Sequence, residues 1–363
     1  MKKQRPSNPF ADRLAAFAAK LRRRRVAAAI VQDEANQKGL AGFGCDNGRL
    51  CVTADGAAPA VFYTDFRYIP AARREAPWLT VRDIDRFDPK DIVRLGSGCL
   101  KVGYEGTIRT SRYLAMRKEF RNAKFVDIGE DLLMLRAVKT PCEIAKITAA
   151  AALHDRIWRE ALREVKPGMT EKDIQRIIRA WMNALGDGEA FETIVCAGKN
   201  AAECHHVPDG TVWRRDEPLL VDMGVKLDGY CSDMTRCIPG AAGRSKGMPS
   251  RYDEIYSLVL GANRAAVAAV RPGITGRKLD AIARSVIRKA GFGKCFGHAL
   301  GHGVGLEIHE MPVASRKSKT VLKPGMVVTI EPGVYIEGEL GVRIEDLVLV
   351  TKDGCEVLSS SPK

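Results

Sequence analysis

The chain has 363 residues, of which 45% are hydrophobic and 28% are charged, and its formal net charge at pH 7 is +14. This length allows two domains of ordinary size, and the composition is typical of a soluble globular protein. No apolar run approaches the roughly 20 residues of a membrane helix, and Met1 to Phe10 lack the apolar core of a signal peptide. We therefore expect a cytoplasmic protein with no membrane partner.

The first 25 residues are strongly basic. They hold nine Lys or Arg residues and a single acid, Asp12, and end in Arg22-Arg23-Arg24-Arg25. Such a run could bind nucleic acid or another anionic surface. No aromatic residues are interleaved with these arginines, as they are in many single-strand binders. We therefore expect a solvated tail and helix end, and we do not expect nucleic acid as a partner.

Residues from about 9 to 130 alternate between helical and strand patterns, as in an α/β unit. Asp12–Arg25 is predicted to be a helix, and Val26–Val31 a short strand. Further strands are predicted at Leu50–Thr53, Ala60–Tyr63, Leu79–Val81 and Lys124–Val126, with a turn at Ala54-Asp55-Gly56 between the first two of these.

The pattern changes near Leu135–Pro141. Thr140-Pro141 is a typical helix start, and it precedes a long amphipathic segment over Glu143–Val165. We place the boundary between 130 and 140 and expect two domains, residues 1–134 and 135–363.

The second part contains an internal repeat. Val165-Lys-Pro-Gly-Met-Thr170 recurs as Val270-Arg-Pro-Gly-Ile-Thr275, 105 residues later. Downstream, the run from Val212 to Val225 matches the run from Val321 to Val334 at an offset of 109. Because a repeat of this kind sets the architecture, we expect two similar halves related by a pseudo-two-fold axis.

Each half delivers two acids. Asp222 and Asp233 flank an Asp-Gly turn, so we expect them to lie roughly opposite each other on paired strands. Glu331 and Glu345 flank Gly338 and Gly341 in the same way. Acids are also common on exposed strands, but Asp222 and Glu331 each follow an apolar run. Buried acids need partners, so a cation is expected among the four carboxylates.

Histidines gather near the same segments. Of the six histidines, His298, His302 and His309 lie in one glycine-rich stretch, and His205 and His206 are adjacent. One imidazole with four carboxylates suits Mn²⁺, Co²⁺, Fe²⁺ or Zn²⁺. Four acids are more than one cation needs, and two ions sharing carboxylates hold a hydroxide and polarise a carbonyl. The sequence therefore predicts a hydrolase with two divalent ions.

At these residues the sequence resembles the pita-bread metallopeptidases, which include methionine aminopeptidase, aminopeptidase P and prolidase. The matching segments are Val221–Arg236, His298–Glu310, Thr329–Gly333 and Gly341–Asp346. Leu40-Ala-Gly-Phe43 and Thr64-Asp-Phe-Arg-Tyr68 are similar to strings of the aminopeptidase P and prolidase branch. The resemblance implies an α/β (α+β) protein, with a C-terminal pita-bread domain that contains a pseudo-two-fold repeat and a smaller creatinase-like N-terminal α/β domain.

The resemblance also implies roles. Asp222 and Asp233 would hold one ion, His302 and Glu331 the other, and Asp233 and Glu345 would bridge both. Glu331 would also take the proton of the attacking water. The remaining roles belong to the substrate side: His298 and His309 would contact the substrate and the developing oxyanion as catalytic donors, with His205 and Arg343 beside them.

Several activities share this ligand set. The leading expectation is an Xaa-Pro aminopeptidase, which cleaves an N-terminal residue from a following proline. The alternatives are an Xaa-Pro dipeptidase (prolidase), an enzyme like methionine aminopeptidase, and a non-catalytic binding module of the same fold. The intact ligand positions argue against the binding module, and the N-terminal domain argues against methionine aminopeptidase. We expect two Mn²⁺ ions as cofactors, peptides with proline at the second position as substrates, and a homodimer as the common default.

Overall fold

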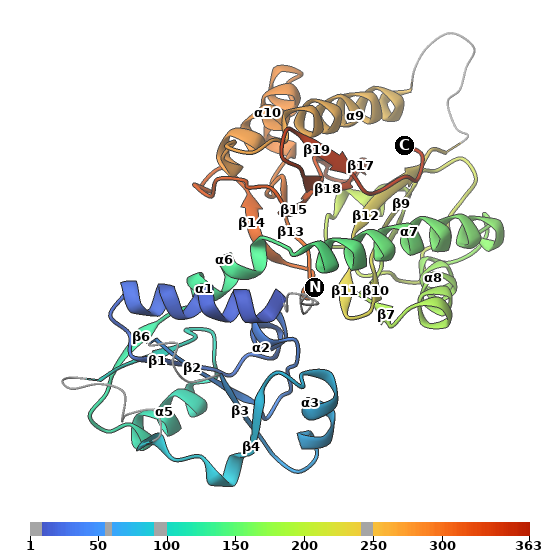
Figure 1. Cartoon of the computed structure of the whole chain (residues 1–363). Helices are drawn as coiled ribbons and strands as arrows, with labels where there is room; N and C mark the ends of the chain where they lie inside the picture. The colour runs from blue at the N-terminus through green and yellow to red at the C-terminus, as the bar shows by residue number, and fades with distance from the viewer. Residues whose placement is uncertain (1–8, 55–59, 91–99, 241–249) are drawn as a thin grey trace, which may run out of the picture. The chain divides into compact units, whose positions relative to one another are not determined.

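The computed structural model describes residues 9–54, 60–90, 100–240 and 250–363 (Figure 1). The chain divides into two compact units, Met1–Arg136 and Ala137–Lys363. Asp55 and Gly56 of the expected turn lie outside the described residues. Among the described helices, none is long and apolar enough to cross a membrane.

Unit 1 is built on a six-stranded mixed sheet with the order β4-β3-β2-β1-β5-β6. The strands are β1 (Ala28–Val31), β2 (Arg49–Thr53), β3 (Val61–Thr64), β4 (Thr80–Asp83), β5 (Lys101–Tyr104) and β6 (Lys124–Asp127). The helices are α1 (Pro9–Arg23), α2 (Glu34–Ala41), α3 (Ile69–Glu75), α5 (Thr110–Glu119) and α6 (Gly129–Ala137), with a 3₁₀ turn η1 (Ile84–Arg86). The five predicted strands correspond to β1–β4 and β6, whereas the sequence patterns did not identify β5.

Both faces of this sheet are buried. Alternate residues of a strand point to opposite faces, and β1 shows this directly. Val31 belongs to the same hydrophobic cluster as Phe17 of α1, whereas Ile30 belongs to the cluster that contains Met116 of α5. Helices therefore cover the sheet on both sides, and α1 supplies part of the core of this unit.

The described residues of unit 2 form four long helices and a set of antiparallel sheets. The helices are α7 (Pro141–Glu164), α8 (Glu171–Leu185), α9 (Arg251–Ala269) and α10 (Gly276–Lys289), with 3₁₀ turns η2 (Gly198–Ala202) and η3 (Gly293–Cys295). The strands of the first half are β7 (Gly188–Glu189), β8 (Ile194–Ala197), β9 (Leu219–Met223), β10 (Val225–Leu227), β11 (Tyr230–Cys231) and β12 (Met234–Ile238). Those of the second half are β13 (Gly301–Gly303), β14 (Glu310–Ala314), β15 (Val327–Ile330), β16 (Gly333–Ile336), β17 (Leu340–Arg343), β18 (Asp346–Val350) and β19 (Cys355–Val357).

The internal repeat predicted from the sequence is confirmed in unit 2. Thr170 caps α8, Thr275 caps α10, and each caps its helix through its side chain. Thr170 also forms an isolated antiparallel bridge with Val212, and Thr275 forms the matching bridge with Val321. Because these four residues were aligned by the repeat, the two halves share their local topology and not only their helix pattern.

Candidate functional site

The first pair of acids lies on a continuous hairpin made by β9, β10, β11 and β12. Thr235 is paired directly with Asp222, and Met234 with Met223. In the same register Asp233 falls opposite Gly224, two positions from Asp222 along the strand. The two acids are therefore diagonal neighbours on one face of the hairpin, rather than directly opposite as the position of the turn suggested.

The second pair lies where two short ladders meet. Ile330 of β15 pairs with Asp346 of β18, and Gly333 of β16 pairs with Arg343 of β17. Between these pairings, Glu331 and Glu345 fall directly across from each other. Glu331 and Glu345 are thus directly paired in register, whereas Asp222 and Asp233 are diagonal neighbours. The longer separation of the two glutamates along the chain agrees with this difference.

His302 reaches the acids from the glycine-rich strand β13. A Cβ atom at Gly301 would clash with the carbonyl oxygen of Thr329, so β13 can lie against β15 only with glycine at this position. His302 Nε2 then lies 3.5 Å from Asp233 Oδ2 and 3.4 Å from Glu331 Oε1. Ligand atoms of Asp233, His302 and Glu345 all lie within 4.8 Å of one another.

Without a cation, the ionised forms of these carboxylates are destabilised by burial and by mutual repulsion. Burial, followed by repulsion from Glu345 and Asp222, raises the pKa of Asp233 well above its usual range. Burial and neighbouring acids likewise raise the pKa of Glu345, and burial is the main cause that raises the pKa of Glu331 to about 8. The site therefore favours any positive charge that can displace these protons.

Two observations fit the metal ions that the sequence implied. Within the part of the chain that the structure describes, Asp222 Oδ1 and Glu345 Oε1 are buried without a hydrogen-bond partner. Burial, followed by the nearby His309, lowers the pKa of His302 to about 4, so its imidazole is neutral near pH 7. Its Nδ1 lies 3.1 Å from Gly303 O, which suits an Nδ1–H donor and leaves Nε2 as a ligand atom.

Thr329 joins two of these side chains. Its Oγ1 accepts a hydrogen bond from His302 N at 3.0 Å and donates to Glu331 Oε1 at 3.2 Å. The sequence analysis did not select Thr329, because a threonine inside an apolar strand looks like an ordinary strand former.

Arg343 lies among the acids and is buried. It donates four hydrogen bonds, to Asp222 Oδ2 (2.7 Å), Tyr335 Oη (2.8 Å), Thr235 Oγ1 (2.9 Å) and Cys204 O (3.3 Å). The arginine expected on the substrate side is thus held mainly by the protein itself. Direct contact with a substrate would have to use what remains of its five N–H donors.

The three expected substrate histidines differ in exposure. His298 is partly buried, and its Nε2 lies 2.9 Å from Tyr335 Oη while its Nδ1 lies 2.7 Å from Ala299 O. His309 is exposed, and its ring centroid is 4.3 Å from that of His302. His205 is exposed in the loop after η2 and lies near enough to His298 to lower its pKa slightly, after burial and Arg343. His298 thus contacts Tyr335 and His309 contacts His302, whereas His205 is related to them only through its effect on His298.

A second carboxylate–histidine cluster lies under the loop that carries His205. Glu171 is fully buried, and it accepts hydrogen bonds from Ala197 N (2.7 Å), Asn200 Nδ2 (3.0 Å), His206 Nε2 (2.7 Å) and Asp209 N (3.0 Å). Its ligand atoms are close enough to those of His206 and Asp209 to hold a cation. However, these four donors already satisfy the carboxylate, so this cluster is better explained as the anchor of the His205 loop.

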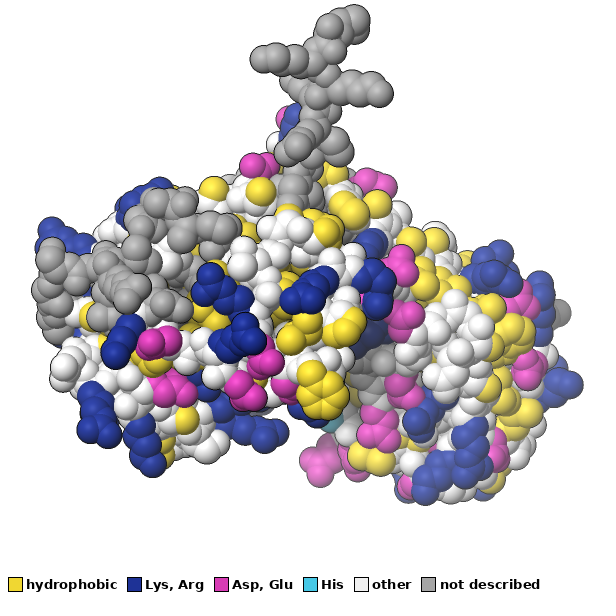
Figure 2. Space-filling model, turned by 60° about the horizontal axis from the view of Figure 1, so that its bottom comes forward, with side chains coloured by type: hydrophobic (Ala, Val, Ile, Leu, Met, Phe, Trp, Pro, Cys, Tyr) yellow, Lys and Arg dark blue, Asp and Glu magenta, His cyan; other side chains and the backbone are white. Residues whose placement is uncertain are grey.

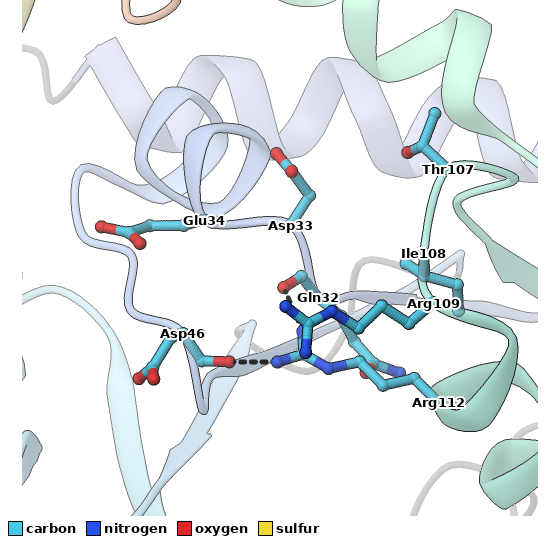
Figure 3. A pocket seen from close by; sticks show the side chains of 8 residues that line it. All are labelled: Gln32, Asp33, Glu34, Asp46, Thr107, Ile108, Arg109 and Arg112. Carbon is cyan, nitrogen blue, oxygen red and sulfur yellow. Dashed lines mark hydrogen bonds between the residues drawn. The ribbon is translucent and has the colours of Figure 1, made fainter.

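Unit 1 contains a polar pocket of about 320 Å³ that the sequence analysis did not anticipate (Figure 3). Its lining carries charges of both signs: Gln32, Asp33, Glu34, Asp46, Thr107, Ile108, Arg109 and Arg112. Arg112 is tied to the backbone, since it donates to Gln32 O at 3.3 Å and to Asp46 O at 2.5 Å. The residues come from loops and from the first turns of α2 and α5, and their sequences carry no motif that would bring them together.

Comparison with known proteins agrees with both units. Residues 13–138 match the Creatinase/Prolidase N-terminal domain, and residues 145–352 match metallopeptidase family M24. The Xaa-Pro dipeptidase of Pyrococcus furiosus is 35% identical over 313 residues, which cover 86% of this chain and 87% of the relative.

Solved structures are similar over nearly the whole chain. The Xaa-Pro dipeptidase from Bacillus anthracis has a TM-score of 0.88 and 34% identity, and the match covers 97% of this chain and 98% of that one. An X-Pro aminopeptidase from Thermotoga maritima has a TM-score of 0.81 and 31% identity, with 94% and 98% covered. With a buried group of carboxylates and histidine in unit 2, this chain belongs to metallopeptidase family M24.

Proposed function

We propose that this protein is an Xaa-Pro dipeptidase, which hydrolyses dipeptides whose second residue is proline. The observation that carries the proposal is a cluster of the buried Asp233 and Glu345 with the half-buried Asp222 and Glu331 around a neutral His302. Two carboxylate oxygens of this cluster have no partner among the described residues. Such a cluster is costly unless it binds cations.

The cluster is proposed to hold two divalent ions. Asp222, Asp233, His302, Glu331 and Glu345 would hold these ions, and Asp233 and Glu345 would contribute to both. Oxygen donors with one imidazole favour Mn²⁺, and Co²⁺, Zn²⁺ or Fe²⁺ would also fit this ligand set. When bound, the ion pair supplies the positive charge that activates water and polarises the scissile carbonyl.

The remaining roles belong to side chains of the protein. Glu331 holds the proton taken from water, as a carboxylate placed beside the reacting water can. His309 donates a hydrogen bond to the carbonyl oxygen of the cleaved bond. His298 is held by Tyr335 and faces the substrate together with His205, and Arg343 keeps Asp222 and Tyr335 in place.

The choice of dipeptidase over aminopeptidase rests on the relatives. The sequence alone led us to expect an Xaa-Pro aminopeptidase, but relatives named Xaa-Pro dipeptidase match this chain at 34% and 35% identity over most of its length. An X-Pro aminopeptidase matches at 31% identity, so Xaa-Pro aminopeptidase is the second candidate. We also propose a homodimer, which light scattering on the purified protein would test.

A substrate panel tests the proposal. With Mn²⁺ at equal loading, we expect kcat/KM for Xaa-Pro dipeptides to exceed that for Xaa-Pro-Xaa tripeptides, since a dipeptidase must exclude longer chains. Met-Ala-Xaa serves as the control for proline selectivity. A preference for the tripeptide would establish the aminopeptidase instead, and cleavage of Met-Ala-Xaa alone would refute both proline assignments.

A further inference from the structure

Asn263 joins the backbones of the two glutamates that lie across from each other. It is fully buried in α9, and its Nδ2 donates to Ile330 O at 3.0 Å and to Ile344 O at 3.3 Å. These two carbonyl groups belong to the peptide bonds that immediately precede Glu331 and Glu345. One amide group therefore uses its two hydrogens to link both peptide bonds.

The link lies between the two ladders, where the strands are otherwise joined by a long backbone hydrogen bond from Ile344 N to Pro332 O at 3.4 Å. The β15–β18 pairing reaches Ile330 and Asp346, and the β16–β17 pairing resumes at Gly333 and Arg343. Between the ladders, the backbone amides of the two glutamates form hydrogen bonds to other segments rather than to each other. Their amide groups donate to Leu300 O at 2.8 Å and to Thr235 O at 3.2 Å.

The contact made by Asn263 Oδ1 determines the orientation of the side-chain amide. Lys363 Nζ donates to Asn263 Oδ1 at 3.0 Å and also forms an ion pair with Asp346. An ammonium group can only donate, so the oxygen of the amide must face Lys363. Nδ2, with its two hydrogens, must then face the two carbonyl groups.

We propose that Asn263 is a positioning residue that holds Glu331 and Glu345 at the separation needed to bind the metal pair. The inference rests on the proposed function, because that proposal makes both glutamates metal ligands. Both glutamates must be ionised to bind metal, and like charges across a strand pair repel each other. Asn263 opposes an increase in the separation of their backbones. Groups that orient metal ligands typically change metal affinity by about 10–100-fold when they are lost.

The test compares metal binding with stability in matched variants. Asn263→Ala removes both hydrogen bonds, whereas Val259→Ala truncates another fully buried side chain of α9 that is apolar. Mn²⁺ affinity is measured by calorimetry, and unfolding of the metal-free proteins is measured in urea. We expect Asn263→Ala to weaken Mn²⁺ binding about 10–100-fold, and Val259→Ala to bind Mn²⁺ like the wild type even if it unfolds as easily.

Asn263→Asp is the second variant, because it keeps the shape of the side chain and places an acceptor against the two carbonyl groups. It should weaken binding in the same direction, and it replaces Asn263→Ala if that variant does not fold. The inference is overturned if the folded Asn263 variants bind Mn²⁺ within twofold of the wild type, or if Val259→Ala weakens binding equally. Failure of the wild type to bind Mn²⁺ would instead refute the proposed metal ligands.

Discussion

Replacing His309 and replacing Glu331, which both lie beside His302, should affect turnover and metal binding differently. His309→Ala removes a donor that touches the ring of His302 but is not a proposed ligand. We expect Mn²⁺ binding close to wild type and a loss in kcat of about 10²–10³, the size reported for one donor to a developing oxyanion. Steady-state kinetics and metal analysis of the same preparation check this.

Glu331→Gln provides the contrast. The amide oxygen can still accept from Thr329, so the fold should persist, but the base and one anionic ligand are lost. Turnover should nearly vanish and metal affinity should fall. If His309→Ala emptied the metal site as Glu331→Gln does, then the division between ligand and substrate histidines would be wrong.

The raised pKa of Glu331 predicts how pH affects the metal-free protein. Its pKa is about 8 when folded, against a usual value of 4.5, so the folded state holds this proton more tightly than the unfolded chain does. The stability contributed by the protonated carboxyl is present below about pH 4.5 and is lost as the pH rises towards 8. In EDTA, the unfolding free energy of the wild type should therefore fall relative to that of Glu331→Gln between pH 5 and 8. A constant difference would contradict the raised pKa.

The residues of the site were not equally predictable. Asp222 and Glu331 could be found because a carboxylate after an apolar run is rarely left unpaired in a core. Tyr335, Thr329 and Asn263 could not, because a tyrosine or threonine in a strand and an asparagine in a helix have ordinary local explanations. Their contacts depend on the register between distant strands, which local patterns do not encode.

At the scale of elements, a buried ion pair holds the start of the strand that follows His309. Lys139 Nζ lies 3.0 Å from Glu310 Oε2 at the first residue of β14, and the two side chains are only 1% and 2% exposed. Lys139→Met leaves Glu310 buried without this cation. We expect a loss of about 3–5 kcal/mol in unfolding free energy, as measured in urea.

The double variant Lys139→Met/Glu310→Gln separates charge from packing. Because it also removes the buried negative charge of Glu310, it should recover part of the stability that the single variant loses. A single variant as stable as the wild type would show that this pair does not anchor β14.

The elements also show where sequence patterns succeed. Repeated Pro-Gly turns and capping threonines predicted two similar halves, since caps and turns are local features. The sequence did not predict the diagonal placement of Asp222 and Asp233. That placement follows from the two-residue turn at Asp228 and Gly229, where both residues have positive φ and set the register of the hairpin.

At the scale of the whole chain, the basic residues near the N-terminus are partly accounted for by contacts within unit 1. Arg22 donates to Ala54 O at 2.6 Å, and Arg24 pairs with Asp131. On the face shown in the space-filling view, Lys and Arg side chains are interspersed with acidic ones (Figure 2). These contacts support the interpretation of a helix end. Deleting residues 1–25 would not test the role of the basic residues alone, because it would also remove Phe17 and Leu21 from the core.

The charge of the metal site should also govern the response of the whole chain to metal removal. After reconstitution and desalting, metal analysis should approach two Mn²⁺ per chain, because four carboxylates exceed the need of one ion. Bound metal adds stability that grows with its free concentration, by about 2.7 kcal/mol at 100 times the dissociation constant. Urea unfolding should therefore shift to a higher midpoint with Mn²⁺ and to a lower one with EDTA.

The double variant Asp222→Asn/Glu345→Gln is the control for this response. It neutralises one acid from each half, and Asp222 Oδ1 and Glu345 Oε1 are both buried without a hydrogen-bond partner among the described residues. In EDTA, the lost repulsion among the buried acids should offset part of the stability that is lost with the Arg343–Asp222 ion pair. In Mn²⁺ its midpoint should not move. A wild-type preparation that is fully active with no bound metal would rule out the metal pair, whereas a count near one would rule out the sharing of Asp233 and Glu345 between two ions.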